Sequence, residues 1–329
     1  MFFDMKRMIV RTLGIIISAA ALLFAAQEVH AQAKEEIHEL SSFNSLDIQD
    51  DFEVTVTKGN YSVKLTVDAV LAEYVKSYVK GHTLYLFLDE KAVPKDIKKL
   101  YKGRNGMTAI MRATVYTPEL ESVVMSDQAA LTVPDEYAAG SFQLSMTDKS
   151  VVRALSVNCT TANISMKKSS QATMTITAVT DVVVSTENSA KLQLSSSSKD
   201  LSLSASGSSE QNVSSDAGTL TATTEGSSSS VVSVNTGKVY VSSAGSSKLQ
   251  LNGTASTLTA KGTRSCNIDA LNLPVEEAEV TMNSGSITLT PSKLLTVDLS
   301  GGSSVYFNGS PEFKISQIIK STLAPYGTK

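Results

Sequence analysis

Two aspartates, Asp127 and Asp148, are the residues of this chain best placed for acid–base chemistry. A repeat described below places both carboxylates in one column on the surface of the protein. Carboxylates about 5 Å apart can act as a general acid and its partner in the cleavage of a glycosidic bond. Lys168 and Asn188 continue the column, so the competing interpretation is a row of solvated corner residues with partly offsetting charges.

Histidine-based chemistry has few residues to draw on. Beyond residue 31 the chain contains two histidines, His38 and His82, and both lie outside the repeat. A Ser-His-Asp triad and a histidine-ligated zinc site are therefore not expected. The recurrent Gly-Ser-Ser segments do not match a phosphate-binding glycine loop. We expect no catalytic residue besides the two aspartates, no cofactor and no metal site.

Other exposed groups indicate an ordinary protein surface. Tyr240 and Tyr306 fall singly at outward strand positions, so we expect surface residues rather than a platform on which sugars stack. Lys167 and Glu187 fall side by side in the repeat and predict an exposed ion pair, which contributes little free energy. The lysine-rich segment 95–102 is predicted to be a solvated loop, with an anionic partner as the alternative.

The repeat that positions these residues starts at about Pro118. Nine segments alternate apolar and polar residues, and their first residues are 17 to 20 positions apart. The segments are 142–146, 162–166, 182–186, 201–205, 220–224, 239–243, 258–262, 278–282 and 295–299. Alternation with a period of two is typical of a strand with one buried face.

Each unit also contains a small polar corner, a second alternating strand and a second corner. Two short strands cannot bury an apolar face alone, but stacked coils can, because each strand pairs with its equivalent in the next coil. The sequence therefore predicts an all-β fold, a right-handed parallel β-helix (solenoid) of about ten 19–20-residue coils over residues 118–310. A β-sandwich of hairpins is the alternative, but it would not repeat equivalent residues in every unit.

The segments outside the coils predict a leader and two caps. Residues 1–31 are typical of a signal peptide, with basic residues before the apolar stretch 13–26, which is short for a membrane span of about 20 residues. Residues 32–117 predict a β-rich N-terminal cap and the first coils, with one helix at 69–79. Residues 311–329 predict a C-terminal cap, as a strand or a short amphipathic helix.

Charge and cysteine content narrow the possible partners and bonds. Removal of residues 1–31, which hold three basic and two acidic residues, changes the net charge from −3 to −4 and argues against a nucleic-acid partner. Cys159 and Cys266 lie six coils apart, which is nearly 30 Å at about 4.8 Å per coil. A disulfide needs Cα atoms within about 7 Å, so we predict two free or buried thiols.

Several segments together resemble a known family, the GIN-domain proteins, described as autotransporter adhesin heads and common in Bacteroidetes. They are 43–48, 52–59, 82–86, 115–120, the Gly/Ser-cornered coils and 303–311. The resemblance implies a right-handed β-helix and, by the family's description, adhesion or surface binding. No autotransporter barrel segment is recognisable in the sequence, so both the periplasm and the cell surface or exterior stay open as locations.

Three functions are consistent with this sequence. The leading hypothesis is an exported, non-enzymatic binding or structural protein, an adhesin that recognises an extracellular glycan or protein. The first alternative is a polysaccharide-active β-helix enzyme that uses Asp127 and Asp148. The second alternative is a sensor or scaffold component of the cell envelope. The sequence leaves the ligand, the binding face and the oligomeric state open.

Overall fold

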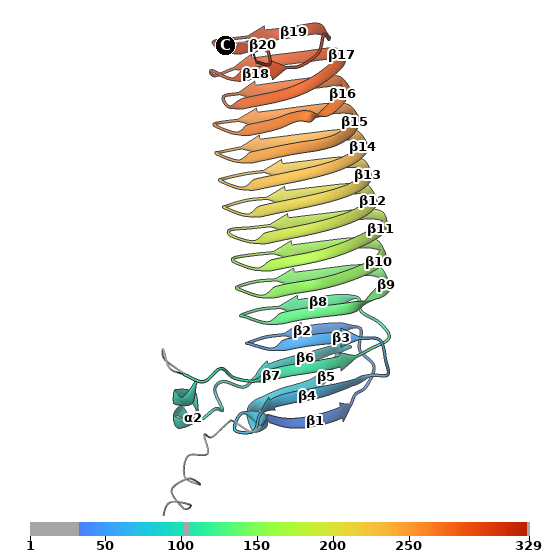
Figure 1. The fold of residues 1–329 in the computed structure, drawn as a ribbon, viewed down its shortest axis with the longest axis vertical. Helices are drawn as coiled ribbons and strands as arrows, with labels where there is room; N and C mark the ends of the chain where they lie inside the picture. Colours follow the sequence, from blue (N-terminus) through green and yellow to red (C-terminus); the bar gives the residue numbers. More distant parts are fainter. Residues whose placement is uncertain (1–32, 102–105, 328–329) are drawn as a thin grey trace, which may run out of the picture.

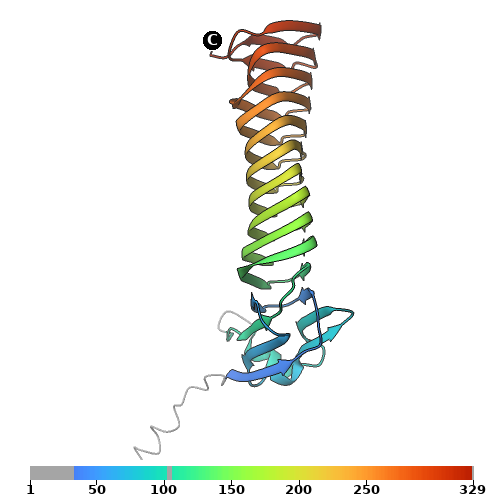
Figure 2. The ribbon, with the colours of Figure 1, turned by 90° about the vertical axis from the view of Figure 1, so that its right-hand side faces the viewer.

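A computed structural model describes residues 33–101 and 106–327, and it is a right-handed parallel β-helix of about 11 turns. Its coils stack along one axis into a rod, with the N-terminal strands at one end and the C-terminus at the other (Figure 1). The view from the side shows how narrow the rod is (Figure 2). The predicted solenoid is confirmed, whereas the predicted signal peptide lies outside the described residues.

The described residues contain one 3-10 helix, η1 (Ala72–Tyr74), and one α-helix, α2 (Lys95–Leu100). The short strands of the N-terminal part are β1 (Ala33–Glu39), β2 (Ser45–Ile48), β3 (Glu53–Thr57), β4 (Ser62–Asp68), β5 (Val75–Lys80), β6 (Thr83–Leu88), β7 (Met111–Tyr116) and β8 (Ser122–Met125). The long strands are β9 (Ala130–Met146), β10 (Val151–Met166), β11 (Gln171–Thr186), β12 (Lys191–Ala205), β13 (Glu210–Thr224), β14 (Ser229–Ala244), β15 (Lys248–Thr263), β16 (Asn267–Asn283) and β17 (Ser286–Ser300). The last strands are β18 (Ser304–Phe307), β19 (Glu312–Ile318) and β20 (Thr322–Pro325).

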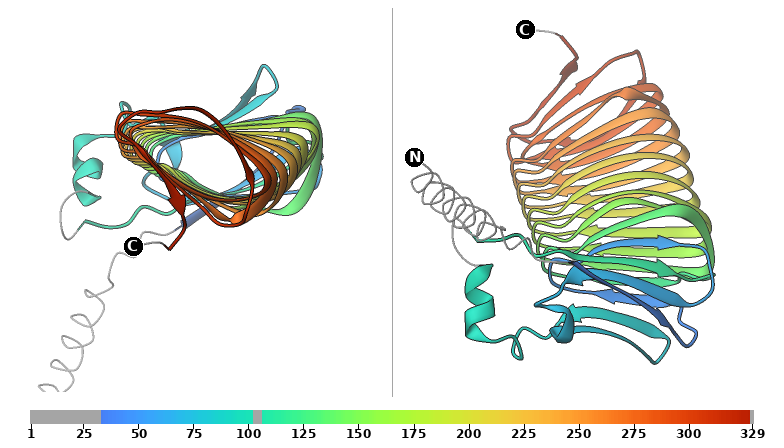
Figure 3. Two further views of the ribbon diagram at one scale, coloured as in Figure 1. Left: turned by 90° about the horizontal axis from the view of Figure 1, so that it is seen from above. Right: turned by 60° about the horizontal axis from the view of Figure 1, so that its bottom comes forward.

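Each long strand forms most of one coil. It runs along one face of the rod, bends and continues along the other face, so that the rod seen from above is a flattened ring (Figure 3). Neighbouring coils pair in parallel, and equivalent residues such as Leu201, Leu220 and Val239 lie directly above one another. This register is what the repeat predicted, and it excludes hairpins in this part of the chain.

The core is a set of apolar columns that run the length of the rod. Val182, Leu201, Leu220, Val239 and Leu258 form one column, and each is at most 1% exposed. Their polar neighbours along each strand point outward, which is the alternation that the sequence shows. Burial of successive columns stabilises the stack because the apolar area removed from water grows with every coil.

The N-terminal coils are interleaved rather than stacked in chain order. Strand β2 pairs with β6 on one side and with β8 on the other, and β3 lies in the same way between β7 and β9. The coil of β2 and β3 is therefore inserted between two coils that come later in the sequence. Where the chain leads from β7 past this inserted coil, the N–H of Thr117 donates to the carbonyl of Thr57 at 3.1 Å.

Two local predictions for this region were wrong. The expected helix at 69–79 is limited to η1, and residues 75–80 form β5, which pairs antiparallel with β6. This pairing stacks Tyr78 on Tyr85 with ring centroids 5.3 Å apart. The contact favours the strand over the helix that the local spacing of apolar residues indicated. The expected loop at 95–102 contains α2 instead, whose early Asp96 and late lysines suit the helix dipole.

The tail and the cysteines also have defined places. Described tail residues form β19 and β20, which pair in parallel with β17 and β18, so of the two expected forms the tail takes the strand. Cys159 and Cys266 are both free and buried, as predicted. Burial raises the pKa of both thiols, so neither is activated as a nucleophile.

The close stacking predicts that glycines differ in their tolerance to substitution. In Gly253→Ala the new Cβ would overlap the carbonyl oxygen of Val234, and the φ of 114° is also strained for alanine. We expect a loss of about 1–3 kcal/mol in the free energy of unfolding, measured by denaturant titration. Gly140→Ala is the control, because Gly140 has open space around it; equal effects of the two variants would contradict the close packing of the coils.

Candidate binding site

A column of tightly turned residues runs along one edge of the rod, and we call it the corner column. Its first members are Asp50, Asp127, Asp148, Lys168, Asn188, Gly207, Gly226 and Gly245, all of which have positive φ. The turns stack through backbone hydrogen bonds, for example from Lys149 N–H to the carbonyl of Asp127 at 2.7 Å. The structure thus places Asp127 and Asp148 in one column, as the sequence predicted.

The backbone explains why these residue types occupy the column. Left-handed φ values, 57° at Asp127 and 63° at Asp148, favour Asp, Asn and Gly over other residues. At Gly207 a Cβ would lie 2.8 Å from the Cα of Asn188, so the close contact between neighbouring coils also requires glycine there. An aspartate in this column therefore does not by itself indicate catalysis.

Asp50 belongs to the same column, although it lies outside the repeat that predicted the column. It precedes Asp127 by 77 residues, and the N–H of Gln128 donates to its carbonyl at 3.2 Å. A signal was present in the sequence, because Asp50 follows the inward Ile48 by two positions just as Asp127 follows Met125. The interleaving of the coils brings the two corners together.

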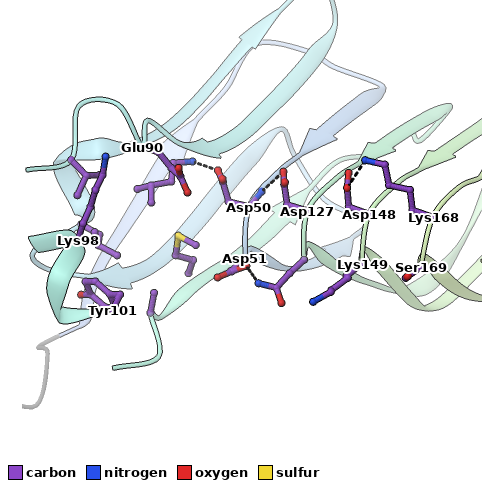
Figure 4. A pocket seen from close by; sticks show the side chains of 16 residues that line it. Asp50, Asp51, Glu90, Lys98, Tyr101, Asp127, Asp148, Lys149, Lys168 and Ser169 are labelled. Carbon is purple, nitrogen blue, oxygen red and sulfur yellow. Dashed lines mark hydrogen bonds and ion pairs between the residues drawn. The ribbon is translucent and has the colours of Figure 1, made fainter. Parts of the chain in front are cut away.

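A cleft of about 650 Å³ lies between the corner column and the α2 segment (Figure 4). Its apolar side includes Leu71, Val93 and Met111, which are all buried. Lys98 and Tyr101 come from α2 and the residue after it. Its polar side is the column itself, with the additional charged residues Asp51, Glu90 and Lys149.

The carboxyl of Asp50 is the least well solvated member of the column. Burial raises its pKa above the ordinary value, although a hydrogen bond from Leu88 N–H to its Oδ2 at 2.7 Å acts in the opposite direction. The neighbouring charges of Asp127, Glu90 and Asp51 raise the pKa further. The half-buried Asp50 therefore favours its protonated form more than an isolated aspartate does.

The two predicted aspartates have different surroundings. Asp148 Oδ1 lies 2.6 Å from Lys168 Nζ, and this contact holds the pKa of Asp148 below its usual range. Asp127 Oδ2 accepts a hydrogen bond from Ser126 Oγ at 2.8 Å. A general acid needs a raised pKa, so Asp148 is suited to remain a carboxylate. A catalytic role for the pair stays a prediction.

The described residues contain no group of three or more His, Cys, Asp or Glu side chains arranged to hold a metal ion. The predicted Lys167–Glu187 pair is present, with Nζ and Oε1 3.3 Å apart and both side chains largely exposed. Tyr240 is 44% exposed on its strand, and Tyr306 is partly buried. Neither tyrosine has an aromatic contact in the described structure, so each stands alone as expected.

A second surface consists of the strand halves that follow the corner column, and we call it the groove face. It carries two hollows, of about 630 Å³ and about 250 Å³. The smaller one is lined by a column of hydroxyls, Ser195, Ser214 and Ser233, in register on β12 to β14. Amides such as Gln193 and Asn212 line the larger one.

Polar side chains in and beside the smaller hollow also bond from coil to coil. Asn235 Nδ2 donates to Asp216 Oδ1 at 3.0 Å, and Thr254 Oγ1 donates to Asn235 Oδ1 at 3.1 Å. These contacts fix the side-chain orientations before any ligand binds, which lowers the entropy lost on binding. The groove face is thus an ordered array of hydrogen-bonding groups repeated at about 4.8 Å per coil.

Comparison with known proteins now identifies the class to which this fold belongs. A family profile described as "Putative auto-transporter adhesin, head GIN domain" matches residues 42–215 and 202–311. These matches cover most of the chain, so the protein belongs to this GIN-domain family. The family resemblance noticed in the sequence is confirmed.

Solved structures resemble the chain at low sequence identity. A "putative adhesin" from Bacteroides fragilis NCTC 9343 is 15% identical, with 89% of this chain and 97% of that chain covered and a TM-score of 0.29. A "putative adhesin" from Parabacteroides distasonis ATCC 8503 is 16% identical, with 90% and 98% covered and a TM-score of 0.33. A "Putative lipid binding protein" from the same organism is 13% identical, with 90% and 97% covered and a TM-score of 0.31. At these scores the structures carry no argument about the site.

Comparison with the curated proteins found no match. Among the described residues, no helix is long and apolar enough to cross a membrane.

The environment of Asp50 predicts how stability depends on pH. Because the folded state raises the pKa of Asp50, its ionisation opposes folding at neutral pH. This penalty disappears as the pH falls below the ordinary value of 3.8, where the carboxyl is protonated in both states. Asp50→Asn should therefore raise the melting temperature at pH 7 and have little effect at pH 3.

Thermal unfolding followed by circular dichroism measures both effects. Asp47→Asn serves as the matched control, because Asp47 lies on β2 outside the cleft. A lower melting temperature for Asp50→Asn at pH 7 would contradict the assignment of Asp50 as a destabilised carboxylate.

Proposed function

We propose that this protein is exported and acts as a non-enzymatic binding protein of the cell envelope, an adhesin that recognises an extracellular glycan or protein. The observation that carries the proposal is the groove face, where two hollows lie side by side on β12 to β14 on one side of a rigid rod. The description of the family as an adhesin head supports the same function.

The chemistry of the groove face fits an extended ligand rather than a compact one. The hydroxyls of Ser195, Ser214 and Ser233 repeat along the rod axis, so a chain laid along them meets the same donors and acceptors on three successive coils. Ser, Asn and Gln offer both donors and acceptors, which suits the hydroxyl groups of a glycan. An extended polypeptide, with alternating N–H and C=O groups, is the alternative ligand.

Several features favour binding over hydrolysis. Asp148 is held as a carboxylate by Lys168, and the corner conformation accounts for aspartates at these positions. The groove face lies beyond the corner and does not include Asp127 or Asp148. A polysaccharide-active enzyme therefore remains the alternative, with these two aspartates as its residues.

Removal of hydroxyls from the groove face should weaken binding. The triple variant Ser195→Ala, Ser214→Ala and Ser233→Ala should bind a ligand found on glycan or extracellular-protein arrays about tenfold or more weakly, since each hydrogen bond contributes roughly 0.5–1.5 kcal/mol. The replaced side chains are exposed, so the melting temperature should not change.

A matched triple variant on the opposite face provides the control. Ser145→Ala, Thr221→Ala and Ser242→Ala also remove three exposed hydroxyls, but from the strand halves before the corner column. Surface plasmon resonance with the same ligand should show unchanged affinity. An equal loss in both variants, or the absence of any array ligand, would argue against the groove face as the binding surface.

The enzymatic alternative has its own test. If the protein only binds, the wild type and the double variant Asp127→Ala, Asp148→Ala should both leave polyuronates and neutral glycans intact, as measured by reducing-end release. Turnover by the wild type that is lost in the double variant would establish the enzyme in place of the adhesin.

A further inference from the structure

The two ends of the rod differ. At the N-terminal end, β7 is covered by the antiparallel β4, which β1 covers in turn, and β6 is covered by the antiparallel β5. The edge strand β1 is rich in charged residues, whereas the other end is apolar. At the other end, β19 pairs only with β17, and β20 pairs only with β18, within the described chain. The view from above shows this last coil on top of the stack (Figure 3).

The last coil exposes side chains that belong to core columns. Phe313, Ile315 and Ile318 are paired with Leu295, Val297 and Leu299, which are all fully buried. Yet Phe313, Ile315 and Ile318 are 46%, 53% and 39% exposed. Ile319 and Tyr326 add exposed fractions of 52% and 57% at the same end. Residues that an additional coil would bury therefore form an apolar end surface.

The backbone of this end is also open to pairing. A strand that is hydrogen-bonded on one side presents a row of N–H and C=O groups on the other side, and such an edge is a template for another strand. Strand β19 contains no proline. Its charged Glu312 and Lys314 pair with Leu294 and Thr296, which are partly exposed, and so lie outside the apolar rows. They leave the apolar rows and the edge accessible.

We propose that this end surface binds the same end of a second copy of the chain, so that two rods join tail to tail. Every contact between coils inside the rod joins two apolar rings of nearly equal shape, and the open end presents one half of that contact. The same end of a second copy supplies an apolar ring of matching cross-section. Glu312 and Lys314 give the edge both charges, so two antiparallel edges are not uniformly repelled.

The symmetry closes the assembly at two copies. A two-fold axis across the joint brings the edges together antiparallel, and the contact is the same on both copies. The N-terminal ends, covered by their antiparallel strands, point away from each other. The pair is then a rod of double length with two groove faces, which increases the apparent affinity for a repetitive ligand.

The oligomeric state of the purified protein tests the proposal. Size-exclusion chromatography with light scattering and sedimentation should show a dimer that dissociates on dilution. Ile315→Lys places a charge in the apolar end surface and should weaken the dimer about tenfold or more, with an unchanged circular dichroism spectrum. Val179→Lys is the matched control, because Val179 is 73% exposed at the wide bend of the rod; it should leave the dimer intact.

Spin labels on single introduced cysteines test the orientation, since the two native cysteines are buried. Labels at Lys293→Cys, near the joint, should give a measurable distance between copies. Labels at Lys80→Cys, on β5, should lie roughly 100 Å apart, at about 4.8 Å per coil over two rods, and give none. A monomer at all concentrations, a dimer that survives Ile315→Lys, or close Lys80 labels would overturn the proposal.

Discussion

The parallel, in-register pairing of each coil with the next is the interaction on which the rest of this structure depends. It places equivalent residues such as Leu201, Leu220 and Val239 in continuous columns, so that a thin core of aliphatic side chains is buried along the whole rod. Neither strand of a single coil could bury its apolar face alone. Stability therefore increases with each added coil, and the end coils are the ones that lack a neighbour on one side.

The same pairing determines which chemistry the surface carries. Stacked corners need residues that tolerate positive φ, which is why Asp127, Asp148 and Asn188 are followed by glycines along one edge. Outward positions on the strands are free of this constraint and carry hydroxyls and amides. Outward side chains can therefore differ from coil to coil without disturbing the inward columns.

The pairing between coils ends in a different way at each end of the rod. At the N-terminal end the chain returns as antiparallel strands, which cover the first coil and use its hydrogen-bonding groups. At the C-terminal end, Phe313 and Ile315 continue the core columns and remain half exposed. A surface of this kind is either covered by a partner or prone to unspecific strand pairing, which gives the tail-to-tail contact its physical basis.

The sequence by itself determined the coil architecture, the Asp127–Asp148 column and the separation of Cys159 from Cys266. The reason is that a period of 19 or 20 residues states which residues lie above one another in successive coils. Only the tertiary structure decided that Asp50 joins the column, since this contact spans 77 residues and depends on interleaved coils. It also decided that residues 75–80 form a strand, because β6 offered pairing that local spacing does not reveal. The cleft, the groove and the open end depend on contacts between distant segments, and a periodic pattern carries no information about these.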